Sequence, residues 1–252
     1  HYLSGIILNQ GDRIMIDKMV GKTEVALYGL AYSIGMLVQL FISGMNSALT
    51  PWMYSKIKKG DIRSMRKVLQ LLSVVVVGIA VALMLISPEL VLIFGSPKYR
   101  EAVYVIPPVA ASVFFIFIYN ILSMPQFYYE KTQFLMAASM AAAGANVVLN
   151  FIFIRLFGYI AAGYTTLACY MLYSVGHYIV SKRILVNEGI QENLMSPGFL
   201  VACSAFLIGA SIICNLIFPY RILRYAILLA SAGLVFWKKE LLLKTMADIR
   251  KK

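Results

Sequence analysis

Charged residues, histidines and cysteines are all scarce in this sequence. Only 13% of the residues are charged, whereas 61% are hydrophobic, and a soluble domain carries about 25% charged residues. The mean hydropathy of +0.80 excludes an ordinary soluble domain and indicates an integral membrane protein. In a membrane protein, a net charge of +12 indicates basic loops that set the orientation of the chain. We therefore expect no nucleic-acid partner.

Reactive side chains are too few to build a catalytic site. The histidines are His1 and His177 only, and the three cysteines lie within apolar runs at spacings that match no metal or redox motif. No facing carboxylate pair, Ser/His/Asp set or metal cluster can be assembled. Gly21-Lys22-Thr23 resembles the end of a phosphate-binding loop, but Ile16 stands where that motif needs an earlier glycine. We expect no enzyme activity, no cofactor, no metal and no ATP hydrolysis.

Long apolar runs occupy most of the chain instead. A helix needs about 20 apolar residues to cross the hydrocarbon core, so the 252 residues allow roughly eight spans. We expect an all-α polytopic transmembrane helix bundle with spans at 1–19, 25–54, 68–87, 102–124, 132–154, 156–181, 194–220 and 222–237. Glycines and Pro51 predict a tilt or bend in the second span. The eighth is short for a full crossing, and an interfacial helix is expected at 238–252.

The basic residues predict how the chain is oriented. Most of the 23 Lys and Arg residues fall in one set of alternate loops, and the densest cluster runs from Lys56 to Lys67. The positive-inside rule places these loops and the C-terminus in the cytoplasm, which predicts a multi-pass protein of the cytoplasmic (inner) membrane. The same cluster is expected to contact anionic membrane lipid.

An adjacent acid and base, Asp12 and Arg13, interrupt the first apolar run. Charges at membrane depth are costly and usually mark a binding site or a pathway. Neighbours on a helix point about 100° apart, so the two do not pair with each other. Arg13 can pair with Asp17, whereas Asp12 needs a partner on another helix, a water-filled cavity or a proton. Either the charges reach the outer interface, or Arg13 faces an aqueous cavity and attracts an anionic head group while Asp12 sets its geometry.

Several uncharged polar residues also lie within the spans. The amides are Gln39, Asn46, Asn120, Gln126, Asn146 and Asn150. Asn146 and Asn150 share one helix face, as do Tyr28 and Tyr32, which are candidates for a sugar-binding wall. Amides in membranes bond between helices more often than they bind substrate, and for the tyrosines packing is the simpler interpretation. The candidate substrate-binding residues are therefore Arg13, Asp12, Tyr28, Tyr32, Asn46, Asn146 and Asn150.

The order of several motifs resembles a known family. The chain contains, in order, Gly11-Asp12-Arg13, Gly21, Tyr28, Ala31-Tyr32, Pro51, the basic loop with Gly60-Asp61, Pro88-Glu89, Gly95, Tyr99, Asn146, Asn150 and Gly158. This order is similar to the polysaccharide transporter (O-antigen, capsule and exopolysaccharide flippase) branch of the multidrug/oligosaccharidyl-lipid/polysaccharide flippase superfamily. Arg155 departs from it where a proline is common, as does Ala161-Ala162-Gly163 where a Gly-Ala-Ala sequence is usual. The resemblance covers residues 1–181 and fades after them.

The resemblance implies an architecture and a function. Such proteins have two six-helix lobes around a central cavity, often with two further helices. Residues 1–181 resemble the second lobe, and 182–252 would be the two additional helices with a basic cytoplasmic tail. The implied function is the movement of polyprenyl-diphosphate-linked oligosaccharides across the cytoplasmic membrane by alternating access, together with an N-terminal six-helix lobe. Arg13 would attract the phosphates, and Asp12 would orient it or couple transport to a cation.

Other functions fit many apolar spans as well. A drug/cation antiporter of the same superfamily would favour acidic and aromatic residues in the cavity, and Asp12 is the one acidic candidate there. A membrane-embedded glycan polymerase or ligase would carry a large extracytoplasmic loop, which this chain lacks. A scaffold subunit that does not transport remains compatible with the sequence.

Overall fold

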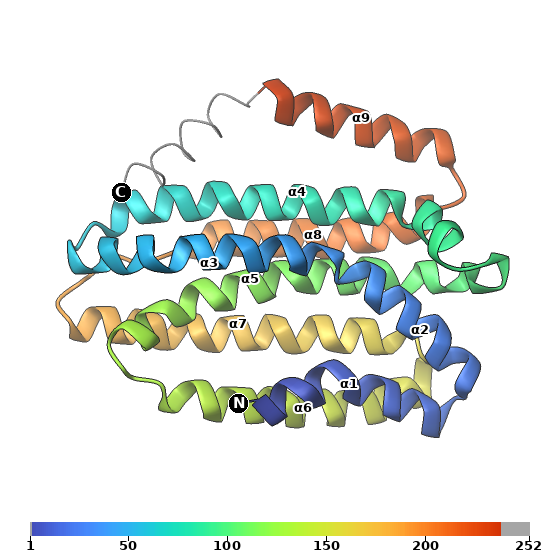
Figure 1. Ribbon diagram of the computed structural model, residues 1–252, viewed down its shortest axis with the longest axis horizontal. Helices are drawn as coiled ribbons and strands as arrows, with labels where there is room; N and C mark the ends of the chain where they lie inside the picture. Colours follow the sequence, from blue (N-terminus) through green and yellow to red (C-terminus); the bar gives the residue numbers. More distant parts are fainter. Residues whose placement is uncertain (1, 238–252) are drawn as a thin grey trace.

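The chain is a bundle of long helices, and the computed structural model describes residues 2–237 (Figure 1). No strand occurs between these residues. The elements are α1 (Tyr2–Met19), α2 (Lys22–Gly35), α3 (Leu37–Lys58), α4 (Ile62–Phe94), the 3₁₀ helix η1 (Pro97–Val105), α5 (Ile106–Tyr128), α6 (Gln133–Phe157), α7 (Ala161–Asn187), α8 (Pro197–Ile217) and α9 (Arg221–Trp237). The predicted all-α helix bundle is confirmed, whereas the predicted interfacial helix at 238–252 lies outside the described residues.

Five stretches are long and apolar enough to cross a membrane by length and composition. They are Lys22–Lys58, Ile62–Phe94, Pro97–Tyr128, Gln133–Phe157 and Pro197–Ile217. Five such stretches indicate a multi-pass membrane protein. Of the remaining helices, α1 and α7 are more polar, and α9 has only 17 residues.

The second expected span is two helices joined at Met36. Helix α2 ends at Gly35 and α3 begins at Leu37, which confirms the predicted bend but places it before Pro51, which lies inside α3. A Cβ atom on Gly35 would lie 2.6 Å from Cγ1 of Val109. Glycine is therefore needed where α2 meets α5.

Helix α5 forms the centre of the bundle. Every residue from Ile106 to Ile118 is buried, and α5 packs against α7, α4, α3, α8 and α2. A helix that is apolar on all sides is stable only when it is covered all round. Pro107 and Pro108 stand in the first turn of α5, where no backbone N–H is needed for the helix.

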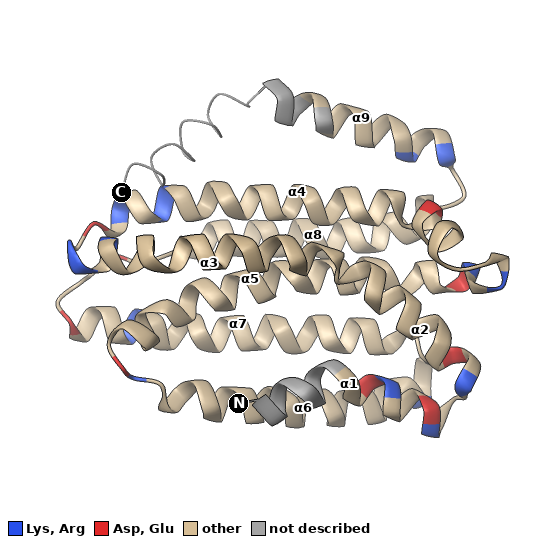
Figure 2. Ribbon diagram, viewed as in Figure 1, with Lys and Arg blue, Asp and Glu red and all other residues tan. Residues whose placement is uncertain are grey.

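Charged residues gather at the two ends of the bundle, and fewer lie along its length (Figure 2). At one end, the α3–α4 turn is held by Lys56, whose Nζ lies 2.5 Å from Asp61 Oδ2. The other carboxylate oxygen of Asp61 caps α4 by accepting from the N–H of Ser64 at 3.3 Å. The opposite end carries the α1–α2 turn, η1 and the start of α9 (Figure 1 and Figure 2).

Candidate functional site

The carboxylate of Asp12 is completely buried and is bound by three other helices. Oδ2 accepts the hydroxyl of Tyr28 at 2.5 Å and the hydroxyl of Thr166 at 2.8 Å. Oδ1 accepts Nδ2 of Asn150 at 2.5 Å. The donors come from α2, α7 and α6, so one acidic side chain of α1 joins four helices.

A second set of bonds fixes these donors. Nδ2 of Asn150 also donates to Oδ1 of Asn146 at 3.1 Å, and Oδ1 of Asn150 accepts the hydroxyl of Thr165. Nδ2 of Asn146 lies 3.5 Å from the hydroxyl of Thr166. Asn146 and Asn150 meet α1 from one face of α6 because they are one helical turn apart. Together with Asp12 and Tyr28, these residues form what we call the Asp12 cage.

The donors of the Asp12 cage are all neutral, so the cage compensates the carboxylate without a counterion. Three donors satisfy an ionised carboxylate, because a carboxylate accepts only. A protonated carboxyl also fits, since the hydroxyls of Tyr28 and Thr166 can rotate and accept its proton. Protonation of Asp12 would therefore reverse the donor and acceptor in one of its bonds to α2 or α7.

Arg13 lies next to the Asp12 cage but outside it. Its guanidinium carbon is 5.5 Å from the centre of the Tyr32 ring, and its Nη1 donates to Gln10 at 3.3 Å. Its Nε is buried and has no hydrogen-bond partner within residues 2–237. No carboxylate of the described chain lies within 4.0 Å of Arg13, so the pairing that its spacing to Asp17 allows does not form. Its charge is therefore not neutralised by an ion pair within residues 2–237.

The predicted site residues thus fall into three groups. Asp12, Tyr28, Asn146 and Asn150 meet in the Asp12 cage, and Arg13 lies against Tyr32 beside it. Tyr28 is fully buried and bonded to Asp12, so it supports the acid and does not line an open wall. Asn46 lies on α3, outside the Asp12 cage, and its backbone carbonyl accepts the hydroxyl of Thr50 at 2.8 Å. The binding roles assigned to these residues stay predictions.

Sequence reasoning missed the contribution of α7. Thr165 and Thr166 complete the Asp12 cage, although hydroxyl residues are ordinary in membrane helices. A signal was available at helical spacing: Thr166, Tyr170, Tyr173 and His177 lie on one buried side of α7. His177 bonds through Nδ1 to Nε2 of Gln126 at 2.8 Å, so the buried amide of α5 is explained by bonding between helices.

Acidic, histidine and cysteine side chains do not gather elsewhere in residues 2–237. No group of three or more that could hold a metal ion occurs there. The Asp12 cage supplies one carboxylate whose two oxygens accept three hydrogen bonds, a group that can gain or lose a proton.

Comparison with known proteins gives the family context. The MatE family model matches residues 4–152, which is more than half of the chain. A Haemophilus influenzae protein described as "Uncharacterized membrane protein" is 31% identical over 134 residues, covering 50% of this chain and 32% of that protein. The Haemophilus influenzae "Lsg locus putative protein 1" is 28% identical over 148 residues, covering 56% and 35%. The matches span about a third of these relatives. No solved structure matches significantly.

Proposed function

The chain belongs to the MatE family of membrane transporters, and from this premise we propose that it works in a flippase for polyprenyl-diphosphate-linked oligosaccharides. The flippase would move these lipids across the cytoplasmic membrane for surface polysaccharide assembly. Residues 1–181 would act as the second six-helix lobe opposite an N-terminal lobe, and the C-terminus would lie in the cytoplasm.

The Asp12 cage is the observation that carries the ion-coupled transport in this proposal. It ties α1 to α2, α6 and α7 through one acidic group. A change in the charge of that group alters the bonds of four helices together, which is what a transporter needs to couple an ion to a rearrangement. We therefore assign Asp12 to coupling, with a proton or a monovalent cation as its ligand.

Arg13 supports an anionic substrate. It lies one residue from the coupling acid, has no carboxylate partner in the described chain, and contacts the face of Tyr32. A guanidinium suits phosphate oxygens because its N–H groups form a planar fork. A diphosphate that contacts Arg13 would bind α1, the helix whose bonds to its neighbours depend on the charge of Asp12.

Translocation in vesicles tests the substrate. Full-length protein is reconstituted with a fluorescent polyprenyl-diphosphate oligosaccharide, and an external quencher reports the lipid that reaches the outer leaflet. We expect Arg13→Gln to slow translocation at least tenfold, since one charged contact contributes about 1.5–3 kcal/mol. Arg155→Gln is the matched control, because the Arg155 guanidinium lies 4.0 Å from the centre of the Phe151 ring on the same chain, outside the Asp12 cage.

Two results would contradict the proposal. Equal rates for the wild type and Arg13→Gln would remove Arg13 from substrate binding. If the wild type exchanges a lipophilic cation for protons but leaves the lipid-linked sugar in place, the protein is a drug/cation antiporter, a function that the buried acid at Asp12 would also serve.

A further inference from the structure

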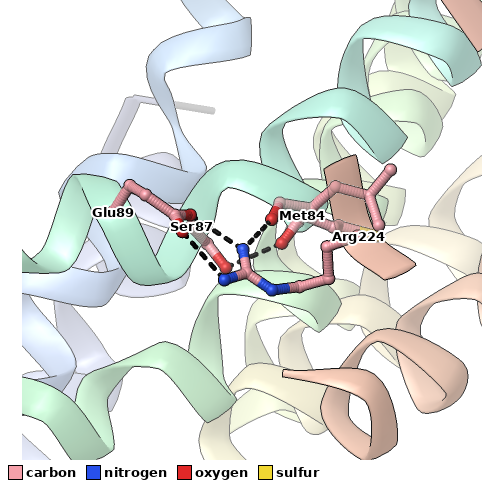
Figure 3. A network of polar contacts seen from close by, with 5 residues as sticks. Met84, Ser87, Glu89 and Arg224 are labelled. Carbon is pink, nitrogen blue, oxygen red and sulfur yellow. Dashed lines mark hydrogen bonds and ion pairs between the residues drawn. The ribbon is translucent and has the colours of Figure 1, made fainter. Parts of the chain in front are cut away.

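A second polar site lies at the start of α9, separate from the Asp12 cage. Arg224 reaches from α9 to α4, where its Nη1 and Nη2 each lie 2.8 Å from a carboxylate oxygen of Glu89. Nη1 also donates to the carbonyl of Leu85 at 2.5 Å. Figure 3 shows this fork between the two helices. Arg224 is only 3% exposed, so this ion pair fixes one end of α9 against the bundle.

The ion pair forms one side of a cavity of about 770 Å³. The cavity lies between the end of α4, η1 and the α8–α9 turn, and three further cations line it: Lys98, Arg100 and Arg221. All three are exposed, and no carboxylate of residues 2–237 lies within 4.0 Å of them. The lining contains two acids, Glu89, which is paired with Arg224, and Glu101. The cavity therefore has an excess of positive charge.

A further feature concerns Arg224 itself. This residue lines the cavity, and its Nε atom is buried and has no hydrogen-bond partner in the described chain. A buried donor of a charged group normally has an acceptor. An anion in this cavity would supply acceptor atoms and balance the exposed cations.

The rest of the lining is apolar. Leu92, Tyr104 and Phe218 contribute to it, and the rings of Tyr104 and Phe218 are 5.8 Å apart. Leu92 is 48% exposed. Cations beside an exposed apolar wall, at the end of a membrane helix, match the boundary between the head group and the acyl chains of a lipid. A free anion would use the cations and leave this wall uncovered.

We propose that this cavity binds the phosphate head group of an anionic phospholipid. The phosphate lies among Lys98, Arg100 and Arg221, and the acyl chains leave along Leu92. The bound lipid then joins η1 to α9, next to the Arg224–Glu89 pair. This site is at the opposite end of the bundle from the Lys56–Lys67 cluster and does not depend on the transported substrate.

Photo-crosslinking tests the site. Full-length protein in a neutral detergent is incubated with a photoreactive phosphatidylglycerol, and labelled peptides are mapped by mass spectrometry. We expect labelling of the segments 97–104 and 218–224. Because each cation near a membrane surface contributes about 1 kcal/mol to binding of anionic lipid, the double variant K98Q/R221Q should reduce this labelling roughly thirtyfold.

The control and the competitors separate the alternatives. K18Q/K22Q removes the same charge from exposed positions at the same end of the bundle but outside the cavity, and should label as the wild type does. Unlabelled phosphatidylglycerol should displace the probe, and inorganic phosphate should not. The proposal is overturned if phosphatidylcholine labels the segments equally, if K98Q/R221Q keeps wild-type labelling, if both double variants lose it alike, or if inorganic phosphate displaces the probe.

Discussion

The hydroxyl of Tyr28 offers the cleanest test of the Asp12 cage. It donates to Asp12 at 2.5 Å, and Tyr28 is fully buried, so water cannot replace it. Tyr28→Phe keeps the ring and removes only this donor. A hydrogen bond to a charged group contributes about 1.5–3 kcal/mol, and we expect the free energy of unfolding to fall by that amount.

Tyr178→Phe is the matched control: it also removes one tyrosine hydroxyl, but no loss of stability is expected. The hydroxyl of Tyr178 is buried and has no partner in residues 2–237, so its removal should leave stability unchanged or raise it slightly. Both variants are unfolded by denaturing detergent in mixed micelles, and the free energies are compared. The reasoning is refuted if the two variants differ by less than about 0.5 kcal/mol, the lower limit for one hydrogen bond.

Two further predictions use the same titration. Gly35→Ala places a Cβ 2.6 Å from Val109 Cγ1 and should lower the free energy of unfolding by about 1–3 kcal/mol through overpacking. In the control Gly78→Ala the new Cβ meets nothing within 4 Å, so this variant should be more stable by up to about 1 kcal/mol. Equal stabilities of the two variants would show that α2 and α5 are not in close contact. Glu89→Gln leaves the buried charge of Arg224 without its carboxylate and should lower the free energy of unfolding by about 3 kcal/mol. Proteolysis at the α8–α9 turn should also become faster. An unchanged cleavage rate would show that this ion pair does not hold α9.

Apolar periodicity and length were sufficient to predict the bundle. The run at 102–124 is apolar on all sides, and the structure places it in α5 at the centre. The limits of the helices were less predictable: α4 extends over Ile62–Phe94, beyond the expected 68–87. Its first turn is polar and capped by Asp61, so hydropathy underestimates a helix that continues past the membrane boundary.

Part of the Asp12 cage was also predictable. The cost of a charge at membrane depth requires a partner for Asp12 on another helix, and the structure supplies partners from α2, α6 and α7. Their identity could not be derived, since Thr166 is 154 residues away in the sequence and only the packing of α7 brings it to α1. Hydroxyl groups of α7 face the bundle in the same way: Thr165, Thr166, Ser174 and Ser181 are buried.

In the proposed transporter, the two polar sites would have different roles. The Asp12 cage joins helices through neutral donors whose bonds depend on the charge of Asp12, whereas Arg224 and Glu89 form an ion pair between α9 and α4. A transporter needs both, because the helices that move must do so against helices that stay in place.

The central claim is that Asp12 couples an ion to transport, and gradient-driven translocation tests it directly. Asn can replace Asp12 in the cage, because its oxygen can accept from Asn150 and its amide can donate to the hydroxyls of Tyr28 and Thr166. The full-length Asp12→Asn protein should therefore fold as the wild type does. In vesicles, an imposed proton or sodium gradient should accelerate translocation of the lipid-linked oligosaccharide by the wild type and leave Asp12→Asn unaffected. Equal acceleration of both proteins would contradict the assignment.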